Sequence, residues 1–319
     1  MRDRKFTRLQ KILKIFLGAA IILFLAVLCF FLPFYALLPA KRLPQREEGE
    51  LRLHLLSGVG DCKIVEFPSG KLLMINGGDG SLKSRNEIYR YVKGLNPVSV
   101  SLLATDANGS CVGGFVRILE NFPVERAYLP AFSKETGSYA KFVSALQDRD
   151  VPAARITRYG AIADPSGAYA VCLSPYRTEE DASDASVVLW LGYGDVGIFL
   201  AGNTSSMRER RIYDEYLIDS TIFDTADYRV RLSETDIYVA PSHGARGGTR
   251  GELLQLLGAK EALVQCGRGC APSSETMLLF AQEGLNVYRT DELDAVTVSI
   301  RNGAYRVIAH FGDNRRQLD

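Results

Sequence analysis

The residues of this chain that could do chemistry are few, and the densest group of them lies between Ala104 and Phe115. This stretch, "ATDANGSCVGGF", follows a strand-like run, "VSVSLL", and precedes a helix-like segment, "VRILENF". A small-residue turn between a strand and a helix is a common place for an active site. Yet the loop holds no histidine and only one charge, Asp106. The whole chain has three histidines, His54, His243 and His310.

Nucleophilic catalysis finds little support in these residues. Cys111 and His243 could form a nucleophile and base pair, because an adjacent base activates a thiol. A buried or disulfide-bonded cysteine is the favoured interpretation, since nothing in the sequence places the two side chains together. A Ser/His/Asp triad around Ser242 and His243 has the same weakness. His54 and His310 lie in strand-like runs, where a half-buried structural histidine is the favoured interpretation.

Strand-like and helix-like segments alternate after residue 50. "CKIVEF" and "KLLMIN" flank a "PSG" turn, and "ASVVLWLGYG" and "DVGIFLAGN" meet at a glycine turn, so both pairs predict hairpins. Helical periodicity predicts helices at 84–95, 112–122, 134–150, 205–218, 250–258 and 273–284. Two groups of strands, each accompanied by helices, predict an α/β domain. Either a four-layer αββα sandwich or a doubly wound sheet fits this pattern.

The N-terminal region predicts a membrane segment. Residues 15–40 are 26 residues without a charge, and six basic residues precede them. About 20 apolar residues span a bilayer as a helix, and flanking basic residues stay in the cytoplasm. We predict a basic cytoplasmic tail at 1–14, a transmembrane signal anchor at 15–38, a linker at 39–49, an extracellular domain at 50–313 and a tail at 314–319. A cleaved signal peptide is the alternative, but its apolar core is shorter.

Charge and cysteine content restrict the partners further. The first 14 residues carry +5 and the whole chain +1, so the remainder carries −4 and gives no electrostatic footprint for nucleic acid. Five cysteines lie in the predicted exported part, where disulfides persist, and the odd number leaves at least one thiol unpaired within the chain. Cys266 and Cys270 lack the second pair that a structural zinc site needs.

Five segments follow the order of motifs in a known family. "LRLHLLSGVGDCKIVEFPSGKLLMINGG" has a G-x-G-D turn and a strand ending before Gly-Gly, and "LLATDANGSCVGGF" resembles a T-H-x-D-x-D-H-x-G-G loop. "SVVLWLGYGDVGIFLAGN" resembles a hairpin ending in G-D, and "TDIYVAPSHGARGGT" resembles V-x-x-H-H-G-S. "VYRTDELDAVTVSIRNGAYRV" resembles the closing strands. The segment from Leu51 to Phe311 is thus similar to the metallo-β-lactamase-fold domain of ComEC-type competence proteins, which implies the αββα four-layer sandwich.

This resemblance also implies a cleft in which most metal ligands are replaced. In the family, histidines and aspartates of these loops hold one or two metal ions, which activate water. Here Asp106 and Cys111 stand at histidine positions, Ser242 replaces one of two paired histidines, and only His243 remains. Asn76, Asn108, Ser110 and Asn203 stand at aspartate positions. The implied vestigial cleft comprises Asp61, Asn76, Asp106, Asn108, Ser110, Cys111, Asn203, Ser242 and His243.

Two functions from different classes remain open. The first is a non-catalytic, membrane-anchored pseudoenzyme that uses this domain as a binding or accessory module for an unknown protein or small molecule and needs no cofactor. The second is a metal-dependent hydrolase, acting on phosphodiester bonds or DNA by family analogy. It would hold zinc or manganese with Asp106, Cys111 and His243, which offer a carboxylate, a thiolate and an imidazole. The replaced ligands favour the first.

Overall fold

The structure is a computed structural model that describes residues 14, 16–24, 26, 40–132, 137–176, 185–267, 270–311 and 314–317. The chain divides into two compact units, Met1–Arg42 and Leu43–Asp319. Within the described ranges, none of the helices combines the length and the apolar character that crossing a bilayer requires. Most of the predicted basic tail (1–14) and more than half of the predicted signal anchor (15–38) lie outside the described residues.

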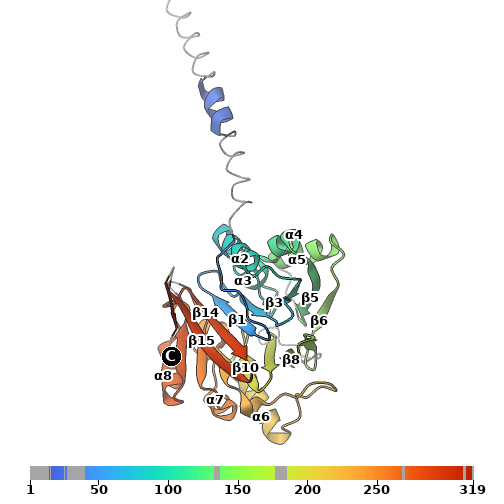
Figure 1. The fold of residues 1–319 in the computed structure, drawn as a ribbon, viewed down its shortest axis with the longest axis vertical. Coiled ribbons are helices and arrows are strands. Elements are labelled where there is room, and N and C mark those ends of the chain that lie inside the picture. The colour runs from blue at the N-terminus through green and yellow to red at the C-terminus, as the bar shows by residue number, and fades with distance from the viewer. Residues whose placement is uncertain are drawn as a thin grey trace, which may run out of the picture. The chain divides into compact units, whose positions relative to one another are not determined.

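The second unit is built on two mixed β-sheets (Figure 1). In the described part of the chain, the larger sheet has nine strands in the order β16 (Asn314–Gln317), β15 (Ala304–Phe311), β14 (Ala295–Arg301), β1 (Leu51–Leu56), β2 (Lys63–Glu66), β3 (Leu72–Ile75), β4 (Val100–Leu103), β5 (Val124–Pro130) and β6 (Ala153–Ile156). The smaller has seven, in the order β13 (Asn286–Arg289), β12 (Glu261–Val264), β11 (Ile237–Val239), β10 (Val196–Leu200), β9 (Val188–Tyr193), β8 (Tyr169–Ser174) and β7 (Ala161–Ala163). Strands β3–β6 and β10–β13 are parallel within their sheets, and the remaining pairs are antiparallel.

Helices cover the outer face of each sheet (Figure 1). Those on the larger sheet are α2 (Leu82–Leu95), α3 (Gly109–Val112), α4 (Phe115–Asn121) and α5 (Gly137–Gln147). Those on the smaller sheet are α6 (Ser206–Ile218), α7 (Gly251–Leu257) and α8 (Ser274–Gln282), with the 3₁₀ turns η2 (Leu232–Glu234) and η3 (Pro241–Gly244). Three hydrophobic cores result, one between the sheets and one under each helical layer. The α/β sandwich with two sheets is confirmed, and the doubly wound alternative is wrong.

Local sequence patterns explain many of these elements. In β1, Leu51, Leu53 and Leu55 point into the core between the sheets, while Arg52 and His54 point to the outer face. Both predicted hairpins are confirmed, as β2–β3 and β9–β10. Helix α2 begins after Ser81, whose hydroxyl accepts from the amide of Ser84.

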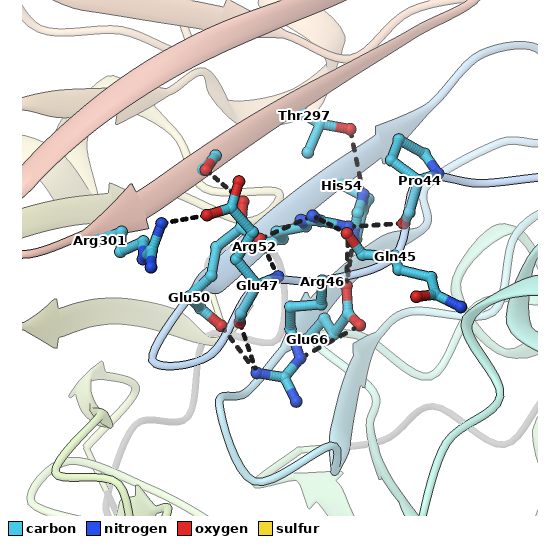
Figure 2. A network of polar contacts seen from close by, with 11 residues as sticks. Pro44, Gln45, Arg46, Glu47, Glu50, Arg52, His54, Glu66, Thr297 and Arg301 are labelled. Atoms are coloured by element: carbon cyan, nitrogen blue, oxygen red, sulfur yellow. Dashed lines mark hydrogen bonds and ion pairs between the residues drawn. The ribbon is translucent and has the colours of Figure 1, made fainter.

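The folded unit extends further at both ends than the sequence indicates. Residues 43–49 fall within the second unit, whereas the sequence predicts a linker through residue 49. Backbone carbonyls of this segment accept hydrogen bonds from Arg52. At the other end, Asn314–Gln317 pairs with β15 as a ninth strand, where the sequence predicts a tail. The segment 43–50 lies over the outer face of β1 (Figure 2).

Candidate functional site

The loops that follow parallel strands carry most of the predicted cleft residues. Asn76 follows β3 and Asp106 follows β4 in the larger sheet, while Asn203 follows β10 and the pair Ser242-His243 follows β11 in the smaller one. Ligands of α/β proteins bind at such carboxyl ends of strands. Because β2 is antiparallel to β3, with Lys63 opposite Ile75, the turn that precedes β2 lies at the same edge. This register adds Asp61 to the group.

A buried polar network joins Asp61 to two of these loops. Asn76 Nδ2 donates to Asp61 Oδ2 and to Thr105 Oγ1, each at 2.8 Å, while Asn76 Oδ1 accepts from the Thr105 amide at 2.8 Å. The ammonium of Lys63 donates to the other oxygen of Asp61. All four residues are at most 5% exposed. Both oxygens of the Asp61 carboxylate are therefore engaged by donors of the chain itself.

The loop after β4 uses its polar residues to start a helix. Asn108 is the N-cap of α3, and its Oδ1 accepts from the amide of Cys111 at 3.1 Å and from the hydroxyl of Ser110. Asparagine is a favoured residue at this position, because its side-chain oxygen satisfies a helix amide that lacks a partner. Cys111 is fully buried in the core under the helices. Burial raises the pKa of its thiol, and the negative charges of Asp61 and Asp106 add to that effect.

The loops of the smaller sheet form a second polar group. Ser242 Oγ donates to Asn203 Oδ1 at 3.0 Å, and the backbone N–H of Asn203 donates to Ser186 Oγ at 2.9 Å. Next to Ser186, the Val187 amide donates to the Thr105 carbonyl at 3.1 Å, which ties this group to the loop after β4. The loops from both sheets therefore meet at one edge of the sandwich.

His243 has an unusual backbone and one engaged ring nitrogen. Ser242 and His243 have φ values of 47° and 59°, in the left-handed region that costs L-residues about 1–2 kcal/mol. Nδ1 of His243 hydrogen-bonds the carbonyl of Gln265 at 2.7 Å. The buried amide of Gln265 donates to the carbonyls of Leu56 and Cys62, which fixes the position of the strand β12 end against β1 and β2.

Two residues of this edge were missed by sequence reasoning. Lys63 stands two residues after Asp61 in "GDCK", and Gln265 follows β12 directly. Neither belongs to a motif with recognised chemistry. The register of β2 against β3 and the position of β12 would have been needed to find them.

The residues present do not fit the metal site that the fold family implies. Asp106 is partly exposed and makes no hydrogen bond or ion pair with the described residues, so its carboxylate is open. Cys111 points into the helical core as a protonated thiol, whereas metals bind the thiolate. His243 contributes one imidazole. Among the described residues, no three His, Cys, Asp or Glu side chains converge into a group that could hold a metal ion.

Comparisons with known proteins support the fold. No family model matches the chain. ComE operon protein 3 of Bacillus subtilis (strain 168) is 22% identical over 276 residues, which cover 80% of this chain and 33% of that protein. The chain therefore spans about a third of the length of this curated relative.

Solved structures that are similar to this chain include two proteins of distant sequence. The E377D mutant of CmlA, a diiron β-hydroxylase from Streptomyces venezuelae, is 12% identical with a TM-score of 0.50, over 81% of this chain and 55% of CmlA. The metallo-β-lactamase fold protein YhfI from Bacillus subtilis is 8% identical with a TM-score of 0.45, over 75% of this chain and 96% of YhfI. At these identities the likeness concerns the fold alone.

Proposed function

Because the folded unit is a ComEC-like domain of the metallo-β-lactamase fold, we propose that it serves as a non-catalytic binding or accessory module. The N-terminal basic tail and apolar run anchor it to the cell membrane with the domain outside. The former active-site edge is retained as a structural element, and its polar residues hold the loops of the two sheets together. The partner is a protein or a small molecule that recognises the surface of this domain.

One observation carries this proposal: most of the polar side chains predicted for the cleft are engaged by other groups of the chain, Asp106 being the exception. Asn76 and Lys63 saturate the carboxylate of Asp61, Asn108 caps α3, and Ser242 binds Asn203. Metal-dependent hydrolysis needs several imidazoles and carboxylates directed at one point, so that a bound water loses its proton near neutral pH. The buried ammonium of Lys63 supplies positive charge to Asp61 without a metal ion.

Metal analysis of the complete chain tests the proposal. The full-length protein is purified in lipid nanodiscs without chelator, and its zinc, manganese and iron contents are measured by mass spectrometry. We expect metal far below one ion per chain and a melting temperature that does not respond to added zinc. In parallel, bis(p-nitrophenyl) phosphate is expected to remain intact.

A pair of histidine variants sharpens the test. His243→Ala removes the one imidazole of the cleft, and His310→Ala removes one that lies on β15. Near-stoichiometric metal that is lost in His243→Ala and kept in His310→Ala would overturn the proposal in favour of a metal-dependent hydrolase. Phosphodiester cleavage with the same pattern of loss would have the same meaning.

A further inference from the structure

A second site lies on the outer face of the larger sheet, over β1, β14 and β15. There a cavity of about 300 Å³ is enclosed by the segment 43–47, Tyr91 of α2 and outward-facing residues of the three strands. This volume lies at the lower end of the range for small-molecule pockets. None of the nine residues predicted for the cleft lines it.

The wall of this cavity is the segment 43–50, which ion pairs and hydrogen bonds hold against the sheet (Figure 2). Arg52 donates to the carbonyls of Pro44 and Gln45 at 2.9 and 2.8 Å. Arg46 pairs with Glu66 at 3.4 Å, and Glu47 pairs with Arg301. These contacts reach three different strands, so the wall is fixed before any ligand arrives. Such preorganisation lowers the cost of binding.

The floor of the cavity is polar but carries no net charge. Nδ1 of His54 lies 3.1 Å from Thr297 Oγ1 and 3.0 Å from the Tyr91 hydroxyl, and Thr297 Oγ1 lies 3.0 Å from Nε2 of His310. Burial lowers the pKa of His54, so its ring is neutral at pH 7. Leu43, Pro44 and Ile308 complete the lining with apolar surface.

One of the charged side chains that line the cavity has no ionic partner among the described residues. Of the ionised residues that line the cavity, Arg52 pairs with Glu50 at 2.6 Å and Glu47 pairs with Arg301. Arg306 lines the cavity from β15, is exposed, and has no ion pair or hydrogen bond within the described parts of the chain. The cavity therefore presents a single uncompensated guanidinium beside an apolar surface.

We propose that this cavity binds a small organic carboxylate with an apolar body. The planar guanidinium of Arg306 matches a carboxylate, which it can bind through two parallel hydrogen bonds. The apolar body packs against Pro44 and Ile308, and the hydroxyl and imidazole groups of the floor accept or donate additional hydrogen bonds. A monoanion balances the single positive charge. The site is independent of the former metal edge and of the function proposed for it.

Fluorine NMR on the full-length chain in nanodiscs tests this site with 4-fluorobenzoate as the probe. Its neutral counterpart, 4-fluorobenzamide, has nearly the same shape without the charge. We expect saturable binding of the benzoate and at least about tenfold weaker binding of the benzamide, since a hydrogen bond to a charged group is worth about 1.5–3 kcal/mol.

Three variants assign the binding to the cavity. Arg306→Gln removes the charge and should weaken benzoate binding about tenfold while leaving benzamide binding unchanged. Ile308→Trp fills the cavity and should abolish binding of both probes. Arg126→Gln removes an exposed arginine of β5, on the same sheet but away from the cavity, and should change nothing. Melting curves check that all three variants are folded.

Several results would overturn the assignment. If Ile308→Trp still binds benzoate, the benzoate site is not this cavity. If Arg306→Gln and Arg126→Gln weaken benzoate binding equally, the probe responds only to the surface charge of the protein. Equal affinities for benzoate and benzamide would show that the cavity does not recognise the carboxylate, and would refute the proposal. The absence of saturable benzoate binding to the folded wild-type chain would also refute it.

Discussion

Replacement of Asn76 by Asp tests whether the edge that carries the predicted cleft residues is held together by hydrogen bonds of the chain. Asp stands at this position in the motif that the sequence resembles, so the change introduces the residue of that motif. In the present structure the Asn76 amide group donates to Asp61 and to Thr105, and the side chain is fully buried. An ionised carboxylate has no donor and would lie against the carboxylate of Asp61.

The expected penalty follows from the proton that the new group must keep. Two carboxylates in contact cannot both ionise, so the new carboxyl group remains protonated in the folded state and donates to Asp61. Keeping that proton costs about 1.4 kcal/mol for each pH unit above the ordinary Asp pKa of about 3.9. The free energy of unfolding should therefore fall by about 4 kcal/mol at pH 7 and by about 1.5 kcal/mol at pH 5.

The sign of this pH dependence is fixed by linkage. Between pH 4 and pH 7 the folded variant binds a proton that the unfolded chain has released, so its stability decreases as pH rises. Thermal unfolding of Asn76→Asp at pH 7 should show a melting temperature about 10 °C below that of the wild type, with a smaller difference at pH 5.

A matched control separates the charge from the backbone. Asn302→Asp makes the same change at an exposed turn with a similar left-handed φ, 53° against 63° for Asn76, and should be nearly neutral. The reasoning is refuted if Asn76→Asp is as stable as the wild type at pH 7, or if its penalty does not depend on pH. Recovery of stability on adding zinc would show that the edge still accepts a metal.

Three further predictions concern other parts of the molecule. Lys63→Met leaves the buried Asp61 carboxylate without its cation and should cost about 3 kcal/mol in urea unfolding. Adding Asp61→Asn should recover part of that loss, and strictly additive effects would contradict the ion pair. Because burial lowers the pKa of His54, the unfolded chain binds more proton there than the folded chain as pH falls below about 6.5, so stability decreases towards pH 5. His54→Asn should flatten this decrease, measured from urea midpoints at pH 7.5 and 5, and an unchanged slope would exclude His54 as its source. A membrane-impermeant maleimide should label intact cells at Cys270, which is exposed while Cys62, Cys111, Cys172 and Cys266 are buried. Labelling should be lost in Cys270→Ser, and labelling only after lysis would contradict the outward orientation.

The sequence was sufficient to predict those helices and strands whose formation depends on residues close to one another along the chain. The hairpin β2–β3 follows from two apolar runs around "PSG", and α2 ends where Asn96 adopts a left-handed conformation before Pro97. The short strands β6 and β7 were not predicted, because Ala153–Ile156 and Ala161–Ala163 are only four and three residues long and are rich in alanine, which is depleted in strands. Their strand conformation depends on pairing with β5 and β8.

The features that the sequence did not predict, at the predicted cleft and at the cavity beside β1, depend on contacts between segments that are distant along the chain. Lys63 meets Asp61 in the buried network because β2 is paired with β3, and Gln265 reaches Leu56 across more than 200 residues of sequence. The segment 43–49 has the mixed charges of a linker, yet its ionic partners lie on β2 and at the end of β14, and Arg52 of β1 donates to two of its carbonyls. Composition cannot show that such charges have partners.

The packing of the glycines explains why the resemblance includes the glycine turns even where the residues at the ligand positions differ. A Cβ atom at Gly113 would overlap the backbone of Gly80, and one at Gly114 would overlap the carbonyl oxygen of Gly77. The Gly77 amide also donates to the carbonyl of Cys111, so the two glycine turns are packed backbone to backbone. Packing alone therefore requires glycine here, with or without a metal ion. It follows that the glycines of "NGGDG" and "CVGGF" are evidence for the fold alone, whereas evidence about a reaction must come from the residues at the ligand positions of the family motif.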